Sequence, residues 1–247
     1  MKGIGMKKSL PHDAYTQLAD EYSARIDTKP HNAFYERPAV QSLVPDVKNK
    51  NILDAGCGPG VYSEWLLQQG ATVTGIDANE TMLKHARARL GKAVALIHAN
   101  LEEPIDFLAN NEFDGIISPL TITYVKNHSQ LFKEFSRILK DKGWFVFSTE
   151  HPFFSYQYFG VDNYFEARQV ECEWKGFKSP VTMQSYYHSL GSIFEALAEN
   201  NFVVDNLLEP LPTEKFHEVD EERYNRLMKF PLFICIRARK IYLENTA

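Results

Sequence analysis

The sequence contains little cysteine. Cys57, Cys172 and Cys235 are the three cysteines among 247 residues, and they lie far apart. An odd, scattered set with no C-x-x-C pair and no histidine at ligand spacing argues against a disulfide framework and against structural zinc. We therefore expect a protein of a reducing compartment with no bound metal.

Long apolar runs are missing as well. No stretch of about 20 apolar residues occurs, which argues against a transmembrane helix. The basic opening MKGIGMKKSL is not followed by an apolar segment of signal-peptide length. These two absences predict a cytoplasmic protein without a membrane partner.

An excess of positive charge is also missing. The formal net charge is -5, and the lysines do not form long runs. Proteins that bind nucleic acid usually carry a basic patch or stripe that neutralises phosphates. We therefore expect no nucleic-acid partner.

The composition that remains is globular, with 44% hydrophobic and 24% charged residues. A chain of this length can bury a substantial core as one α/β domain with an insertion. We expect a single domain over residues 1–247. Its parts are a helical lid at 1–49, a ligand-binding core at 50–150, a cap insertion at 151–185 and a C-terminal part of the sheet at 186–247.

Within the core, β-rich runs alternate with amphipathic helical runs, which is typical of a parallel sheet covered by helices on both faces. The expected strands are 51–55, 72–77, 93–100, 113–118 and 144–149. The expected helices are 61–69, 80–90 and 129–140. Helical spacing of apolar residues is clearest in the last of these.

The flanking regions are less regular. Residues 151–185 are rich in aromatics and weakly periodic, which suits either a cap over a pocket or a dimer interface. Residues 186–200 read as a helix, and 202–210 and 231–240 as strands, with a loop and a short polar helix between those strands. Residues 14–26 form an apolar helical face that either packs in the core or serves as a lid.

The most specific feature is LDAGCGPG at residues 53–60, directly between the first strand and the first helix. Closely spaced glycines let the backbone approach a ligand, and the carboxyl edge of an open α/β sheet is where ligands bind. Gly56, Gly58 and Gly60 are spaced G-x-G-x-G, whereas the dinucleotide fingerprint is G-x-G-x-x-G. The spacing therefore disfavours a nicotinamide site.

Three polar residues follow neighbouring strands. Asp77 ends the second strand, where its two oxygens can accept both ribose hydroxyls; the alternative is a helix N-cap. Asn100 follows the third strand and can accept from an adenine amino group, or simply shape a turn. Ser118 ends the fourth strand at the same edge.

Together these motifs resemble the class I methyltransferases that use S-adenosylmethionine (SAM), especially the small-molecule group called methyltransferase type 11. The resemblance covers nearly the whole chain, through AYTQLADEYSARI, LDAGCGPG, GIDAN, FDGIIS and FKEFSRILKDKGWFVFSTEHPF. It implies a Rossmann-like, seven-stranded, mostly parallel sheet with the last strand antiparallel. It also implies SAM as cofactor, a small-molecule methyl acceptor as partner, and a monomer or homodimer.

The resemblance also implies roles for single residues. The loop residues that border the methionine part of SAM are Asp54, Gly56, Cys57, Gly58 and Gly60. Asp77 holds the ribose, and the adenine contacts are Ala78, Asn100 and Leu101. The backbone carbonyl of Ser118 lies near the methionyl amino group. Relatives more often have Asp at the position of Asn100, which predicts somewhat weaker adenine recognition.

Candidates for catalysis and acceptor binding are fewer. Relatives often carry a histidine after the fourth strand, where this chain has Thr123. We therefore take His151, which follows the fifth strand, as the candidate general base, with a plain turn as the alternative. The candidate acceptor-binding residues are Tyr22, Tyr124, Tyr187 and His188.

The sequence leaves two other functions open. One is an NAD(P)-dependent oxidoreductase, which the glycine spacing disfavours. The other is a SAM-binding protein without transferase activity, acting as a sensor or partner subunit. Methyl transfer by in-line displacement, with release of S-adenosylhomocysteine (SAH), is the function that we expect.

Overall fold

A seven-stranded sheet forms the centre of the protein. The computed structural model describes residues 8–241. The strands of the main sheet are β1 (Asn51–Ala55), β2 (Thr72–Asp77), β3 (Ala95–His98), β4 (Phe113–Pro119), β5 (Leu139–Glu150), β8 (Phe202–Leu208) and β9 (Phe233–Lys240). Their order is β3-β2-β1-β4-β5-β9-β8.

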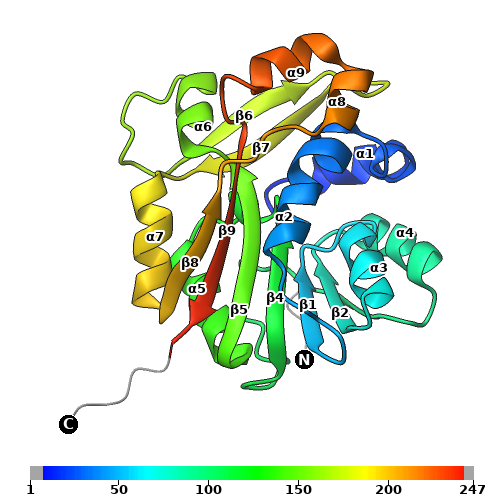
Figure 1. The fold of residues 1–247 in the computed structure, drawn as a ribbon, viewed down its shortest axis with the longest axis vertical. Coiled ribbons are helices and arrows are strands. Elements are labelled where there is room, and N and C mark those ends of the chain that lie inside the picture. Colours follow the sequence, from blue (N-terminus) through cyan, green and yellow to red (C-terminus); the bar gives the residue numbers. More distant parts are fainter. Residues whose placement is uncertain (1–7, 242–247) are drawn as a thin grey trace.

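Strands β1 to β5 pair in parallel, and β9 lies antiparallel between β5 and β8. The expected Rossmann-like sheet with an antiparallel last strand is therefore confirmed (Figure 1). All parallel strands end at one edge, so the loops that follow them share one side of the molecule.

Helices cover both faces of this sheet. On one face, α2 (Arg37–Leu43), α3 (Val61–Gln68) and α4 (Glu80–Leu90) bury apolar side chains against β1, β2 and β5. On the other face, α5 (His128–Ile138) and α7 (Leu190–Glu199) pack against β4, β5 and β9. Side chains along β5 point alternately toward the two helical layers. Phe145 and Phe147 face α5, while Trp144 and Val146 face α2.

The lid lies across the carboxyl edge of the sheet. It consists of α1 (His12–Arg25), the π-helical turn η1 (Asn32–Glu36) and α2. The Asn79 side chain at the start of α4 donates to the His12 carbonyl and to Thr16 Oγ1, at 3.1 and 2.9 Å. These bonds fasten α1 to α4.

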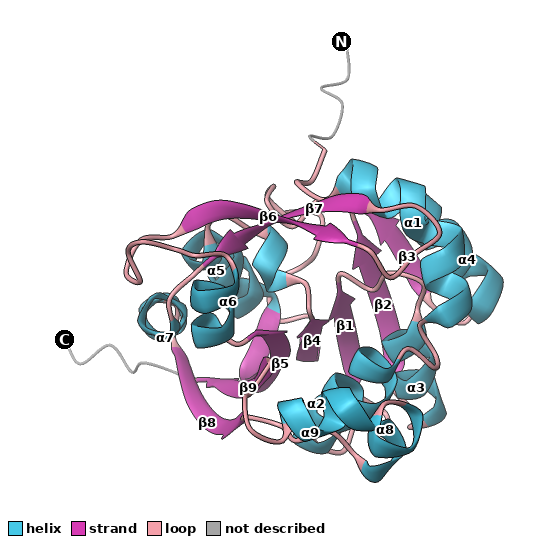
Figure 2. Ribbon diagram, turned by 90° about the horizontal axis from the view of Figure 1, so that it is seen from above, coloured by secondary structure: helices cyan, strands magenta, loops and turns pink. Residues whose placement is uncertain are grey.

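A two-stranded hairpin, β6 (Arg168–Trp174) with β7 (Val181–Tyr187), lies over the same edge (Figure 2). It follows the short helix α6 (Pro152–Tyr158). Ala14 and Leu18 of α1 pack against Val181 and Met183 of β7. The lid and the hairpin therefore meet above the sheet.

The bounds of several elements differ from the sequence expectations. The weakly periodic segment 151–185 contains α6, β6 and most of β7, and along β6 the half-buried Val170, Cys172 and Trp174 alternate with exposed polar residues. Residues 186 and 187, expected in a helix, belong to β7. Helix α5 also ends at Ile138, two residues before the expected boundary, where β5 begins.

The segment between β8 and β9 forms two short helices, α8 (Glu214–Val219) and α9 (Glu221–Leu227), where one was expected. The short 3-10 turn η2 (Ile122–Tyr124) follows β4 at the carboxyl edge. Within residues 8–241, no helix combines the length and the apolar character needed to cross a bilayer.

Candidate active site

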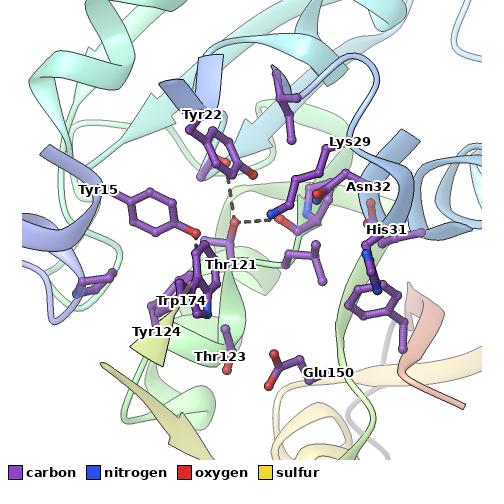
Figure 3. A pocket seen from close by; sticks show the side chains of 18 of the residues that line it. Tyr15, Tyr22, Lys29, His31, Asn32, Thr121, Thr123, Tyr124, Glu150 and Trp174 are labelled. Carbon is purple, nitrogen blue, oxygen red and sulfur yellow. Dashed lines mark hydrogen bonds between the residues drawn. The ribbon is translucent and has the colours of Figure 1, made fainter. Parts of the chain in front are cut away.

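A cavity of about 900 Å³ lies between the carboxyl edge of the sheet and the lid. Its wall is formed by the glycine loop, the tip of β2, η2, the lid, the hairpin and α9. Figure 3 shows labelled side chains from the lid, from η2 and the residue before it, from β5 and from β6 around this space. Segments far apart in the sequence therefore build one site.

The glycine loop is held to the tip of β2. The Gly56 and Cys57 N–H groups both donate to the Ile76 carbonyl, at 2.8 and 2.9 Å. Gly56 has φ +84°, and a Cβ there would lie 2.2 Å from Thr121 Oγ1, so only glycine fits. A Cβ on Gly58 would meet no atom within 4 Å. The loop backbone is therefore bare where it faces the cavity.

Asp77 accepts two backbone hydrogen bonds, from Gly58 N–H at Oδ2 and from Asn79 N–H at Oδ1, both 2.8 Å long. Burial raises the pKa of Asp77, and these two donors oppose the rise. Asn79 is the residue that caps α4, since its side chain accepts from Met82 N–H. The N-cap alternative for Asp77 is thereby removed.

Several buried polar atoms at the cavity lack a partner. In the part of the chain that the structure describes, four buried side-chain atoms have no hydrogen bond, and three belong to cavity residues: His12 Nδ1, Arg37 Nε and Asp54 Oδ1. The other oxygen of Asp54 accepts from Ser63 Oγ at 2.6 Å. Burial raises the pKa of Asp54 to about 7. Unpaired buried groups are costly, so these atoms mark places for a polar ligand.

Aromatic rings form the wall opposite the glycine loop. The Tyr15 ring lies edge-on to Tyr22, Tyr124 and Trp174, with centroids 5.8, 5.7 and 6.2 Å away. The Tyr15 and Tyr124 hydroxyls are 2.9 Å apart, and burial raises both pKa values. This wall is apolar with a single polar pair.

Further carboxyl groups line the cavity, among them those of Glu36 and Glu150. Glu36 is bonded by Tyr62 at 2.9 Å and by Ser148, and burial raises its pKa to about 7. Glu150 accepts from Ser155 Oγ at 3.3 Å, and burial raises its pKa too. Glu150 and Thr123 both line the cavity and are labelled in Figure 3.

The structure brings ten of the sequence-predicted residues to this cavity. These are Asp54, Gly56, Cys57, Gly58, Asp77, Ala78, Asn100, Leu101, Tyr22 and Tyr124.

Two predicted cofactor residues are not among the lining residues. Gly60 has φ +84°, and a Cβ there would lie 2.7 Å from Leu90 Cδ1, so this glycine lets α3 pack against α4. Ser118 is fully buried and donates to the Ala55 carbonyl at 2.9 Å, joining β4 to β1. Pro119 lines the cavity in its place.

His151, the predicted general base, is also outside the cavity wall. Its Nδ1 accepts from Phe153 N–H at 3.2 Å and caps α6, while Nε2 lies 2.9 Å from Glu209 Oε1. Side chains alternate along a strand, so Glu150 faces the cavity and His151 the opposite side. Both ring nitrogens are engaged, and the choice of His151 is corrected.

Tyr187 and His188 do not reach the cavity either. Tyr187 is buried and donates to the Tyr164 carbonyl at 2.8 Å. His188 stacks on His128, with centroids 3.8 Å apart, and its Nε2 lies 3.2 Å from the Val125 carbonyl. Burial lowers the pKa of His188 to about 4. His188 thus contacts the backbone of a lining residue, Val125, and Tyr187 contacts a segment outside the lining.

Sequence reasoning missed the charged residues of the lid and of β5. Glu36 and Arg37 are adjacent charged residues in a helical segment, where burial is unusual for both. Strand alternation would have indicated Glu150 in place of His151. Lys29 and Arg226 gave no local signal, because only the tertiary fold brings them to the site, whereas Trp174 lies in the aromatic segment 151–185 that was expected as a cap.

Residues 53–147 match the family model described as Methyltransferase domain. The chain is also similar to a solved S-adenosylmethionine dependent methyltransferase of Mesorhizobium loti, with 27% identity, TM-score 0.69, and coverage of 83% of this chain and 97% of that one. Residues 53–147 are thus a methyltransferase domain, and the chain is similar to SAM-dependent methyltransferases over most of its length. A solved chain of Listeria monocytogenes shares the fold, with TM-score 0.74 and 24% identity over 84% of this chain and 97% of that one.

This methyltransferase is further similar to a ubiquinone biosynthesis O-methyltransferase of Thiobacillus denitrificans. The two are 34% identical over 40% of this chain and 44% of the relative. The chain thus spans less than half the length of that curated enzyme.

SAM, the cofactor of this family, fits the groups that the cavity offers. SAM carries an ammonium, a carboxylate, two ribose hydroxyls and an adenine. The methyltransferase presents an unpaired acceptor on Asp54, an unpaired donor on Arg37, and the carboxylate of Asp77 beside bare backbone. These groups match the ammonium, the carboxylate and the ribose hydroxyls of the cofactor.

Substitution of His151 by alanine should leave the SAH affinity of the methyltransferase unchanged within about twofold, because the imidazole lies outside the cavity. Loss of the cap on α6 should lower the free energy of unfolding by about 1 kcal/mol. Calorimetric titration and urea unfolding measure the two effects. A large loss of SAH affinity at unchanged stability would return His151 to the site.

Proposed function

We propose that the chain transfers the methyl group of SAM to a small-molecule acceptor bound in the same cavity as the cofactor. The observation that carries this proposal is one cavity reaching from the glycine loop and Asp77 to an aromatic wall. Its volume of about 900 Å³ is at the upper end of the roughly 300–1,000 Å³ typical of small-molecule sites. Such a volume accommodates a cofactor together with a small acceptor.

The name of the Thiobacillus denitrificans relative supports a small acceptor, since that enzyme acts in ubiquinone biosynthesis. The lid supports it too, because α1 and the hairpin pack against each other above the site. An acceptor must then fit between the lid and the sheet edge.

In this proposal, Asp77 binds the ribose hydroxyls. Each of its oxygens accepts one backbone bond and keeps a further lone pair. Ala78 and Leu101 line the adenine pocket. Asn100 Oδ1 accepts from Glu102 N–H at 3.0 Å, so the side chain is fixed for contact with the base.

The methionine part of SAM lies along Gly56, Cys57 and Gly58. The unpaired Asp54 Oδ1 accepts from the ammonium group, and the unpaired Arg37 Nε donates to the carboxylate. These two assignments satisfy buried atoms that otherwise lack partners. Charge-assisted bonds of this kind contribute roughly 1.5 to 3 kcal/mol each.

When bound, SAM would supply a methyl group attached to a positively charged sulfur. In-line attack by an acceptor lone pair would transfer the methyl group, and the sulfur would leave as part of SAH. The protein has to position the acceptor and exclude water, and alignment alone can lower the barrier by up to roughly 7 to 11 kcal/mol. The rings of Tyr15, Tyr22 and Trp174 supply the apolar wall that holds the acceptor. Glu150 can accept a proton from an acceptor that carries one.

Substitution of Asp77 by alanine should weaken SAH binding by about 1.4 to 3 kcal/mol, or roughly 10- to 150-fold, because the ribose hydroxyls lose their acceptor. Isothermal titration gives the dissociation constant, and far-UV circular dichroism checks the fold. The control is Asp46→Ala, at an exposed carboxylate outside the cavity. An unchanged constant in Asp77→Ala would place the ribose elsewhere.

The affinity for SAH should fall as the pH drops below about 7. The pKa of Asp54 in the free protein is about 7, and the ligand ammonium requires the ionised carboxylate, so binding at lower pH must release a proton. The expected slope approaches tenfold per pH unit, with a plateau above pH 7. Titrations at several pH values measure it.

Asp54→Asn separates this effect from the titration of Glu36, whose pKa is also about 7. The variant should bind weakly, with no pH dependence. A slope retained in Asp54→Asn would assign the proton to Glu36. A flat profile for the unmodified protein would remove Asp54 from the ammonium site.

Methyl-labelled SAM incubated with the protein and separate cell fractions tests the proposed function itself. Label should pass to compounds of the small-metabolite fraction, with equal formation of SAH, and Asp77→Ala should lower the transfer. Label found only in protein or RNA would contradict a small acceptor. SAM binding without SAH formation from any fraction would favour a SAM-binding protein without transferase activity, and binding of NADH in place of SAM an oxidoreductase.

A further inference from the structure

Positive charge gathers where the lid and α9 border the cavity. Lys29 lies in the turn after α1, and Arg223 and Arg226 lie on α9, so the cations converge from distant segments. Arg223 is 3.4 Å from Asp220. In the part of the chain that the structure describes, neither Lys29 nor Arg226 forms an ion pair. This side of the cavity therefore presents two cations that no carboxylate of the described residues pairs with.

Lys29 is held by aromatic rings in place of a carboxylate. Its Nζ lies 5.5 Å from the centroid of Tyr22, 5.1 Å from Trp174 and 5.3 Å from Phe177. These rings come from α1, β6 and the hairpin turn. Figure 3 shows the side chain extending toward the middle of the cavity. Burial lowers the pKa of Lys29 to about 8, so the ammonium is charged at neutral pH. The rings stabilise the ammonium group by cation–π interactions and leave its positive charge in place.

His31 lies in the electrostatic field of the same cations. Its side chain lines the cavity next to Asn32, and its pKa falls to about 4, first through burial and then through the charges of Lys29, Arg223 and Arg226. Asp220 opposes the fall. His31 is therefore neutral at physiological pH, and its ring N–H, like the Asn32 amide, is a donor suited to an anion.

None of the carboxyl groups that line the cavity pairs with Lys29 or Arg226 in residues 8–241. Asp54 and Asp77 belong to the glycine-loop end, and Glu173 pairs with Lys175 at 3.3 Å. Glu36 is bonded by Ser148 and Tyr62, and its pKa of about 7 leaves it partly protonated. Glu150 lies on the other side of the space from Lys29 in Figure 3, and burial raises its pKa. An acceptor that carries an ammonium would therefore face Lys29, Arg226 and the sulfonium of SAM together.

We infer, resting on the proposed function, that the methyl acceptor is an aromatic or apolar compound with an anionic group. The anionic group binds between Lys29 and Arg226, within reach of the His31 and Asn32 donors. The apolar part lies against the rings of Tyr15 and Trp174. Carboxylate and phosphate share the chemistry that this arrangement recognises.

Ligand-observed NMR titration of the SAH-loaded protein tests the inference with four matched probes: benzoate, phenyl phosphate, benzamide and benzylamine. Benzoate or phenyl phosphate should bind at least about tenfold more tightly than benzamide, since each charge-assisted bond contributes at least about that factor. Benzylamine should bind most weakly. The tighter of the two anions identifies the group as carboxylate or phosphate.

Variants locate the anion. Lys29→Met should weaken binding of the preferred anion about tenfold, while Lys29→Arg retains it. Arg226→Met should weaken it less, by about two- to fivefold, because the guanidinium is exposed. Benzamide and SAH affinities should stay constant in both. Lys215→Met, at an exposed lysine of α8 outside the cavity, is the matched control.

Equal or tighter binding of benzylamine overturns the inference, as does anion affinity unchanged in both Lys29→Met and Arg226→Met. Absence of binding by either anion to the SAH-loaded protein overturns it as well. Failure of SAH itself to bind, measured first by calorimetry, would instead contradict the proposed function. The two failures are thus distinguishable.

Discussion

The junction between the tips of β1 and β2 is the constraint on which the site is built. Two loop amides, from Gly56 and Cys57, converge on one carbonyl of β2, and Gly58 N–H reaches the carboxylate of Asp77. The glycines allow the chain to turn back sharply enough for these bonds. The same bonds fix the carboxylate beside bare backbone, so a single local arrangement supplies both the shape and the charge of the cofactor half of the site.

The other half depends on segments that have no local reason to meet. Helix α1, the hairpin and α9 are distant in sequence, and each contributes side chains to one cavity. Their packing is apolar where α1 meets β7 and polar where α1 meets α4. Because the apolar contacts involve few buried residues, this half has the smaller core and the larger share of exposed groups. The sheet forms the rigid part of the site, and the lid contributes side chains of different chemical types.

Prediction from the sequence succeeded for the strands and helices of the sheet half and failed for much of the half formed by the lid, the hairpin and α9. Segments 51–55, 72–77 and 80–90 were placed with their exact bounds, because strong apolar periodicity and turn residues bracket them. The hairpin escaped notice, since only three half-buried residues, Val170, Cys172 and Trp174, alternate along its first strand. His151 was chosen by proximity to the sheet edge, whereas strand parity gives Glu150. Lys29 and Arg226 could not be found at all, because long-range convergence leaves no trace in local patterns.

The π-helical turn at Asn32–Glu36 has a consequence for how this chain tolerates change in length. A π turn contains one residue more than an α turn. In this chain the π turn ends at Glu36, and α2 begins at the next residue, Arg37. Deleting one residue would restore α geometry and rotate everything before it by about 100° relative to α2. Tyr35, now buried under Phe233, would swing away, and the alignment of Lys29 with the cavity would be lost. Point substitutions keep the rotation of the preceding residues relative to α2, whereas the insertion or deletion of one residue in this turn would change it.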